Sequence, residues 1–290
     1  MKKIILSSLG VILIQALVFA QQPPGTDIYL FDLAFKKGKF VLTNAVNISD
    51  RKGYDNQPFF HPDKPLIYYT SADEEGRTDI LVYNYASNET QKLTNTPERE
   101  YSPTVTPDKK FISCIIQRDN GAQDLGKYPI DGGNAEIIID NLTVGYHVWR
   151  DDNTLFLFVL GQPNTLHEYS VADKTDKIIS QNIGRSLHRV PGTTNISFVD
   201  KGSAEWNIKK IKRKDGTIET VGKTLPGRED LTWTPGGKII MSDGVKLFYW
   251  MPGKSKDWTP IYFPDGLSLS GITRLTVNAK GNKIAVVANE

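Results

Sequence analysis

The side chains in this sequence best suited to metal binding or proton transfer are its histidines. There are four of them: His61, His147, His167 and His188. Convergent imidazole nitrogens bind transition metals, and a bound metal can activate water or polarise a substrate. His147 and His188 stand at the same distance from a recurring sequence position, which predicts equivalent places in adjacent structural units. They are the candidates for a transition-metal site, and packing between units is the alternative.

Other residue patterns offer less chemistry. The acidic clusters at residues 73–75 and 151–153 carry oxygen ligands of the kind that bind Ca²⁺, but neither has the spacing of a cation-binding loop. The stretch at residues 266–271 lacks the second glycine of a Gly-x-Ser-x-Gly nucleophile turn. Cys114 lies in a β-forming run, which favours a core thiol over a nucleophile. The sequence therefore predicts no catalytic residue and no required cofactor.

The composition is that of a globular protein. Of the 290 residues, 39% are hydrophobic and 23% are charged, which suits a packed core and excludes disorder and a polytopic membrane protein. The formal net charge is +2, and it falls to 0 if Lys2 and Lys3 are removed. A neutral chain has no global attraction for nucleic acid or anionic lipid, so neither is an expected partner.

Residues 1–20 have the pattern of a signal peptide. A short basic start precedes an apolar run, and Val18 and Ala20 suit cleavage after Ala20. The apolar run is interrupted by polar residues and is short for a bilayer span of about 20 residues, so an uncleaved anchor is the alternative. The only cysteine, Cys114, is far from this point, so no lipoprotein attachment is expected. We expect residues 21–290 to form one periplasmic or secreted domain without a transmembrane span.

A repeated phrase organises the rest of the chain. The stretches DNQPFFHPDKPLIYYTS and EYSPTVTPDKKFISCIIQ share two prolines ahead of a β-forming run, and related phrases recur at intervals of about 40 to 45 residues. The recurring positions are Pro62, Pro107, Arg150, Pro191, Pro235 and Ala279. Each unit divides into four short strands rich in Ile, Val, Tyr, Phe and Thr, separated by turn residues. Such repeats are typical of β-propeller blades.

Six units predict an all-β, six-bladed propeller with four antiparallel strands in each blade. The segment after residue 20 offers two strands, DIYLFDL and KFVLTNA, and the last unit offers only TRLTVN and KIAVVAN. We expect these strands to join in one blade and close the ring, which removes exposed sheet edges. The residue two before each recurring position is expected to pack between blades. These residues are Phe60, Val105, Val148, Arg189, Trp233 and Val277.

The repeat resembles the WD40-like Pro-Asp propeller repeat of the TolB-like family. In the first unit the matching residues are Asp55, Pro58, Phe60, Pro62 and Asp63. In the second unit they are Glu100, Pro103, Val105, Pro107 and Asp108. The resemblance spans residues 21–290 and implies the six-bladed propeller fold.

A binding role is the function that we expect of this fold. Segments entering the innermost strands converge at one mouth of the central channel, where aromatic and arginine side chains suit protein or peptide interfaces. The candidate binding residues are Tyr54, Asp55, Asn56, Arg99, Glu100, Tyr101, Tyr146, Arg185, Arg228 and Glu229. For the two acids among them, capping of their own turns is the alternative.

The sequence thus leaves two functions open. The first is a monomeric, non-enzymatic binding or scaffold module with a protein, peptide or glycan partner. The alternative is a carbohydrate-active propeller enzyme, a lyase or a glycoside hydrolase, that uses His147 or His188 with a metal. The separation of the two imidazoles distinguishes these functions, since metal–nitrogen bonds are only about 2.1 Å long.

Overall fold

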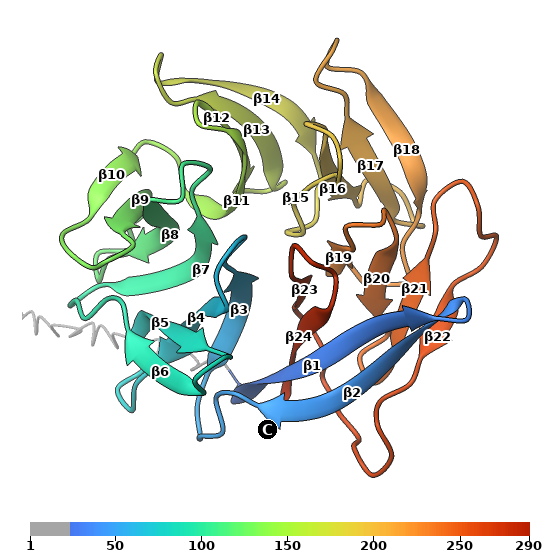
Figure 1. The fold of residues 1–290 in the computed structure, drawn as a ribbon. Coiled ribbons are helices and arrows are strands. Elements are labelled where there is room, and N and C mark those ends of the chain that lie inside the picture. The colour runs from blue at the N-terminus through green and yellow to red at the C-terminus, as the bar shows by residue number, and fades with distance from the viewer. Residues whose placement is uncertain (1–23) are drawn as a thin grey trace, which may run out of the picture.

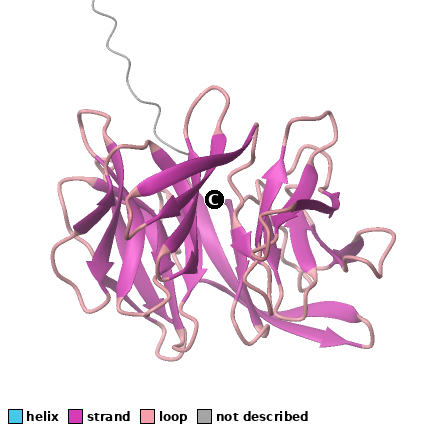
Figure 2. Cartoon of the chain, turned by 90° about the horizontal axis from the view of Figure 1, so that it is seen from above, coloured by secondary structure: helices cyan, strands magenta, loops and turns pink. Residues whose placement is uncertain are grey.

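The computed structural model describes residues 24–290, and every regular element in that part of the chain is a β-strand. Twenty-four strands, β1 to β24, form six four-stranded sheets. The sheets stand as blades around a central axis, and loops join them at both ends of the ring (Figures 1 and 2). The predicted six-bladed, antiparallel propeller is confirmed. The expected signal peptide, residues 1–20, lies outside the described residues.

The first five blades each follow the chain from the axis to the rim. Blade 1 contains β3 (Asp55–Phe60), β4 (Leu66–Ala72), β5 (Thr78–Asn84) and β6 (Glu89–Lys92). Blade 2 contains β7 (Arg99–Val105), β8 (Phe111–Gln117), β9 (Gln123–Pro129) and β10 (Glu136–Ile139). Blade 3 contains β11 (Val144–Asp151), β12 (Thr154–Val159), β13 (Thr165–Ser170) and β14 (Thr175–Gln181). Blade 4 contains β15 (His188–Arg189), β16 (Ile196–Asp200), β17 (Asn207–Ile211) and β18 (Ile218–Lys223), and blade 5 contains β19 (Leu231–Trp233), β20 (Ile239–Ser242), β21 (Leu247–Trp250) and β22 (Thr259–Ile261).

Blade 6 combines strands from both ends of the described chain. From axis to rim it contains β23 (Leu275–Val277), β24 (Lys283–Asn289), β1 (Thr26–Lys36) and β2 (Lys39–Asn47). Tyr29 pairs with Val286, and Leu30 pairs with Ala285, in the antiparallel ladder between β1 and β24. This seam is buried, since Leu30 and Ala285 are 4% and 0% exposed. The predicted closure of the ring is confirmed, and it leaves both seam strands paired on two sides.

The Pro-Asp phrase forms the turn between the first and second strands of a blade. In blade 2 the Asp108 carboxylate accepts hydrogen bonds from Thr106 Oγ1 at 2.6 Å and from the backbone N–H of Lys110 at 3.1 Å. Lys109 donates its backbone N–H to Thr106 O at 2.9 Å and has a left-handed φ of 62°. Gly237 occupies the equivalent position in the turn of blade 5 and has a left-handed φ of 74°. Glycine adopts this conformation without steric strain because it has no Cβ.

The position expected to pack between blades does so in blades 2 and 5, whereas Arg189 of blade 4 is exposed. Val105 of blade 2 lies in an apolar cluster with Tyr68 and Ile80 of blade 1. Trp233 of blade 5 packs against a cluster that contains Val199 of blade 4. Each of these side chains therefore covers the face of the preceding blade, and burial of such apolar surface holds neighbouring blades together.

In blade 3 the residues of the repeat are displaced by one position from the predicted alignment. Trp149 pairs with Leu155, as Val105 pairs with Ile112 in blade 2. Trp149 therefore occupies the inter-blade position that the sequence assigns to Val148. The turn between β11 and β12 is one residue shorter than the turn between β7 and β8, which shifts the alignment of every residue before it.

Two tryptophans at this position make the same hydrogen bond to the preceding blade. Trp149 Nε1 donates to Ser113 Oγ at 2.8 Å, and Trp233 Nε1 donates to Ser197 Oγ at 2.9 Å. Each pair is separated by 36 residues in the chain. The indole thus packs its apolar rings between two blades while its N–H remains satisfied.

Candidate binding channel

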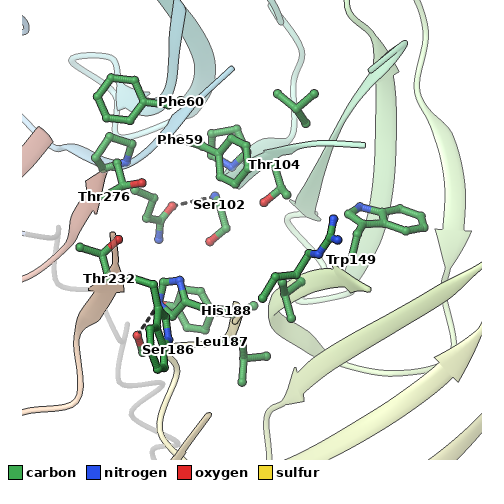
Figure 3. Close-up of a pocket in the computed structure, with 18 of the residues that line it drawn as sticks. Phe59, Phe60, Ser102, Thr104, Trp149, Ser186, Leu187, His188, Thr232 and Thr276 are labelled. Carbon is green, nitrogen blue, oxygen red and sulfur yellow. Dashed lines mark hydrogen bonds between the residues drawn. The ribbon is translucent and has the colours of Figure 1, made fainter. Parts of the chain in front are cut away.

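A channel of about 490 Å³ runs along the axis and is lined by the first strands of all six blades. The pairing registers align these strands, so equivalent side chains form rings around the channel. The central ring comprises Phe59, Thr104, Val148, His188, Thr232 and Thr276. The polar ring lies two residues earlier and comprises Gln57, Ser102, Tyr146, Ser186, Asp230 and Arg274. Figure 3 shows members of both rings around the cavity.

The central ring offers apolar groups and hydroxyls side by side. Phe59 and Val148 alternate around the axis with Thr104, and Thr232 and Thr276 complete the opposite side. In the described part of the chain, each first strand has a paired neighbour on its rim side alone. Its other backbone edge therefore faces the channel, where N–H and C=O groups can pair with an extended chain.

Charge is concentrated at the polar ring. The Asp230 carboxylate accepts two hydrogen bonds from Arg185, from Nε at 3.1 Å and from Nη2 at 2.7 Å. Arg274 also donates to Asp230 through Nη1, and it donates to the Tyr146 hydroxyl through Nη2 at 2.6 Å. The guanidinium of Arg274 lies 4.8 Å from the centroid of the Tyr146 ring. The Asp230 carboxylate thus accepts hydrogen bonds from two guanidinium groups.

These contacts fix the charge of the cluster. Burial would raise the pKa of Asp230, but the charge of Arg274 and the hydrogen bonds and charge of Arg185 lower it to about 2. Burial would lower the pKa of Arg185, but its hydrogen bonds to Asp230 and the charge of that carboxylate raise it. The Glu229 carboxylate also acts on Arg185, and Lys201 pairs with Glu229 at 3.4 Å. Three cationic groups thus face two carboxylates, and the group carries one net positive charge at neutral pH.

Tyr54 approaches the same cluster. Burial raises the pKa of Tyr54, and Tyr146, Arg274, Tyr101 and Arg185 lie near enough for their charges to affect it. These four residues belong to blades 3, 6, 2 and 4 or to the segments that enter them. The Tyr54 side chain is therefore close to the axis, at the end of the channel where the first strands begin.

The structure brings together only part of the predicted set. Of the ten candidate binding residues, Tyr146 and Arg185 line the cavity, and Tyr54 lies beside them. Asp230 and Arg274 line it too, and the sequence analysis missed them. A signal was present: each directly precedes the leucine that begins an innermost strand. That these residues bind a partner remains a prediction.

Three other candidates lie within their own blades. Asp55, Asn56 and Glu100 are buried, with the two acids 0% exposed. Asp55 Oδ1 accepts a hydrogen bond from Arg51 Nη2 at 2.9 Å, and Glu100 Oε1 accepts one from the Tyr128 hydroxyl at 2.9 Å. Burial raises the pKa of both carboxyls, and these hydrogen bonds oppose the rise. The two acids brace the segments that lead into β3 and β7.

The remaining four candidates lie outside the channel wall. Tyr101 is partly buried and packs against an apolar cluster that contains Ile115 and Trp149. Arg99 forms an ion pair with Asp119 at 2.7 Å. Arg228 is exposed and donates to a backbone carbonyl. Glu229 Oε2 accepts the backbone N–H of Arg185 at 2.9 Å. Glu229 therefore acts on the channel indirectly, because it holds the segment that carries Arg185.

The two histidines considered for metal binding do not occupy equivalent positions. His147 pairs with Leu157, whereas His188 pairs with Ser197. With the corrected phase of blade 3, His147 lies one residue earlier in its strand than His188 does. Successive residues of a strand point to opposite faces, so His147 faces blade 2 and His188 faces blade 5. The predicted equivalence is wrong, for the same reason that the inter-blade position shifts.

Both histidines are instead held by serine hydroxyls. His147 Nε2 lies 2.7 Å from Ser113 Oγ, and His188 Nε2 lies 2.9 Å from Ser186 Oγ. Burial lowers the pKa of His147 to about 3 and that of His188 to about 4. Both side chains are therefore neutral at neutral pH.

Within residues 24–290, no group of three or more His, Cys, Asp or Glu side chains is arranged to hold a metal ion. In the acidic clusters considered for Ca²⁺, aspartate side chains accept hydrogen bonds from the backbone N–H groups of their own turns. Asp73 Oδ1 accepts the backbone N–H groups of Glu75 at 3.0 Å and Arg77 at 2.8 Å. Asp151 Oδ1 accepts that of Asn153 at 3.2 Å. The same part of the chain contains no helix long and apolar enough to cross a membrane.

No protein-family model and no curated protein matches this sequence. Solved structures do match the fold. A protein assigned as TolB from Agrobacterium tumefaciens gives a TM-score of 0.68 at 13% identity, over 92% of this chain and 99% of its own. TolB from Acinetobacter baumannii gives 0.57 at 12% identity, over 92% of this chain and 64% of its own. An oligogalacturonate lyase in complex with manganese gives 0.56 at 13% identity, over 86% of this chain and 82% of its own. These similarities show that the chain has the TolB-like propeller fold.

Proposed function

We propose that this propeller of TolB-like fold is an exported, non-enzymatic binding module that holds an extended segment of a protein partner in its channel. The observation that carries the proposal is the channel of about 490 Å³, lined by the central ring and the polar ring. The signal-peptide pattern of residues 1–20 supports export to the periplasm or beyond the cell.

The size and chemistry of the channel support a peptide segment as its occupant. Its volume falls within the range of about 300 to 1,000 Å³ that small-ligand sites occupy, which is room for a few residues. Phe59 and Val148 offer apolar contacts, and Thr104 and Thr232 offer hydroxyls. The backbone edges of the first strands that have no paired strand provide partners for the backbone of an extended segment.

The histidines do not support the alternative of a carbohydrate-active enzyme. His147 faces blade 2, whereas His188 belongs to the central ring of the channel, and each nitrogen Nε2 is already bonded to a serine hydroxyl. A binding role uses the channel without requiring either imidazole to ionise or to hold a metal.

Filling the channel tests the proposal. Thr276 is half-buried and belongs to the central ring, so Thr276→Trp places an indole in the cavity. Thr175 is exposed on the rim strand β14, so Thr175→Trp adds the same side chain away from the channel. Affinity purification from the cell envelope and the medium, with mass spectrometry, should recover a partner with wild type and Thr175→Trp but not with Thr276→Trp. A partner retained equally by Thr276→Trp would refute the channel as the binding site.

A further inference from the structure

We propose that the polar ring, together with Arg185, which pairs with Asp230 of the ring, is a carboxylate-binding site, and that the peptide segment in the channel presents a carboxylate to Arg185 and Arg274. This inference rests on the proposed function, because it specifies the chemistry of the partner that the channel holds. It depends on three features of the ring: its hydrogen-bond donors, its charge and its occupied acceptors.

Most acceptors of the polar ring are used within the protein, and the exception is the Ser102 hydroxyl oxygen. Both carboxylate oxygens of Asp230 accept hydrogen bonds from arginine. Gln57 Oε1 accepts from Thr70 Oγ1 at 3.0 Å and from the backbone N–H of Ser102 at 2.8 Å. Ser186 Oγ accepts the backbone N–H of Leu231 at 3.2 Å.

Several donors of the ring and of the adjoining Arg185, in contrast, have no acceptor within residues 24–290. They are Nη1 of Arg185, Nε2 of Gln57, Oγ of Ser102 and the hydroxyl hydrogen of Tyr146. The Tyr146 oxygen already accepts from Arg274, which leaves its hydrogen free to point elsewhere. Ser102 Oγ is also shielded from solvent, where an unpaired hydroxyl is costly. A ligand that accepts hydrogen bonds would satisfy these groups.

The surplus charge selects the kind of acceptor. Arg185 and Arg274 together exceed Asp230 by one positive charge. A single carboxylate supplies one negative charge and two acceptor oxygens, and the planar guanidinium matches it in a bidentate geometry. Charge-assisted hydrogen bonds of this type are the strong ones, so the carboxylate should dominate the affinity of a short segment.

The occupied acceptors favour a peptide over an acidic sugar. A uronate brings a carboxylate but also several hydroxyl donors, and within the described residues the Ser102 hydroxyl oxygen is the one ring acceptor without a partner. The central ring, two residues further along each strand, offers apolar side chains, hydroxyls and backbone edges instead. A peptide places its carboxylate in the polar ring and its backbone beside these edges.

Matched peptide pools test the inference with the full purified chain. Three fluorescent pools of short random peptides share the same composition: one ends in a free carboxylate, one ends in a carboxamide, and one ends in a carboxamide but contains a single internal Glu. Peptides that the immobilised protein retains are sequenced and their affinities measured one by one through fluorescence anisotropy. We expect the free-carboxylate or the Glu form to bind about tenfold tighter, or more, than the neutral form.

Three variants assign the effect to the ring. Arg274→Gln removes the surplus charge and should bring the carboxylate preference below about threefold. Arg213→Gln is the control, because Arg213 is also paired with one aspartate, Asp151, but lies outside the channel wall. Asp230→Asn frees both guanidiniums and should tighten carboxylate binding, whereas a ring that only braces the axis would make this variant bind more weakly.

The outcomes separate this inference from the proposed function. Retained peptides without a preference for carboxylate would overturn the inference and leave the channel as a peptide site. Retention of oligogalacturonate, tested as a competitor, in place of all peptides would overturn the peptide class. No retention of any pool would overturn the proposed function, and the inference with it. An Arg213→Gln variant that loses the preference as Arg274→Gln does would show that the effect does not belong to the ring.

Discussion

Ser113→Ala should destabilise the propeller more than its matched counterpart Ser197→Ala. Ser113 is 0% exposed, and its hydroxyl donates to Thr104 O at 3.1 Å. Because the hydroxyl has one hydrogen, its oxygen accepts from both Trp149 Nε1 at 2.8 Å and His147 Nε2 at 2.7 Å. This assignment leaves His147 Nδ1 as a buried acceptor without a partner, which the structure shows.

The loss can be estimated from the groups left unpaired. A buried donor that loses its partner costs about 1–3 kcal/mol, so Ser113→Ala, which strands the indole and the imidazole, should cost about 2–6 kcal/mol. Ser197 is 1% exposed and accepts from Trp233 Nε1 alone among side chains, so Ser197→Ala should cost about 1–3 kcal/mol. The difference measures the contribution of His147.

A second background isolates the imidazole. The residues equivalent to His147 in blades 4, 5 and 6 are leucines, so His147→Leu follows the pattern of the repeat. In that background, Ser113→Ala strands the indole alone and should cost about 1–3 kcal/mol, as Ser197→Ala does in the wild type.

Equilibrium unfolding in urea measures these free energies, followed by tryptophan fluorescence and by circular dichroism. Coincident transitions from the two probes would establish that unfolding is cooperative enough for the comparison. The hydrogen-bond reasoning fails if Ser113→Ala costs no more than Ser197→Ala, or if its cost is the same with and without His147.

Three further predictions concern His147 and His188, the ring closure and the thiol. Burial lowers the pKa of His147 to about 3 and that of His188 to about 4, from an ordinary 6.5. At pH 5 both imidazoles are therefore protonated in the unfolded chain and neutral in the folded chain. The free energy of unfolding, measured in urea, should therefore fall by about 2 kcal/mol per histidine between pH 7 and pH 5, and His147→Leu should remove its share. Leu30→Pro breaks the ladder opposite Ala285 and empties a buried site, so it should lower the unfolding free energy by about 3 kcal/mol or more in the same assay. Cys114 is 0% exposed and burial raises its pKa, so a thiol reagent should label it rapidly in urea and very slowly in buffer; equal rates would contradict its burial.

The fold could be predicted from the sequence because its information is local and repeated. Each strand is a short β-forming run, and the first turn carries a proline or glycine in every blade but blade 3. The two strands at each end of the described chain can complete a sheet by pairing with each other. The phase of blade 3 could not be predicted. Arg150 has no proline to mark the turn, and a turn shortened by one residue moves Trp149 into the place expected for Val148. That single shift also produced the apparent equivalence of the two histidines.

The candidate site was harder to predict, because it depends on contacts across the axis. Tyr146 and Arg185 were found because aromatic and arginine residues near a strand entry suggest binding. Asp230 and Arg274 are 44 residues apart, and Arg274 and Tyr146 are 128 residues apart. No local pattern indicates which blades meet at the axis, so the pairing of two arginines on one carboxylate appears only when the ring is closed.

Stability alone gives no reason for charge in the polar ring. Two residues further along the first strands, the channel is lined by the apolar side chains of Phe59 and Val148, so apolar residues fit the axis. Two guanidiniums and a carboxylate must give up hydration to lie there, and apolar replacements for buried ion pairs are often neutral or stabilising. A ring that only closed the axis would need neither a surplus charge nor donors without acceptors. The charge of Arg185 and Arg274 is better explained by a bound anion than by the fold that positions it.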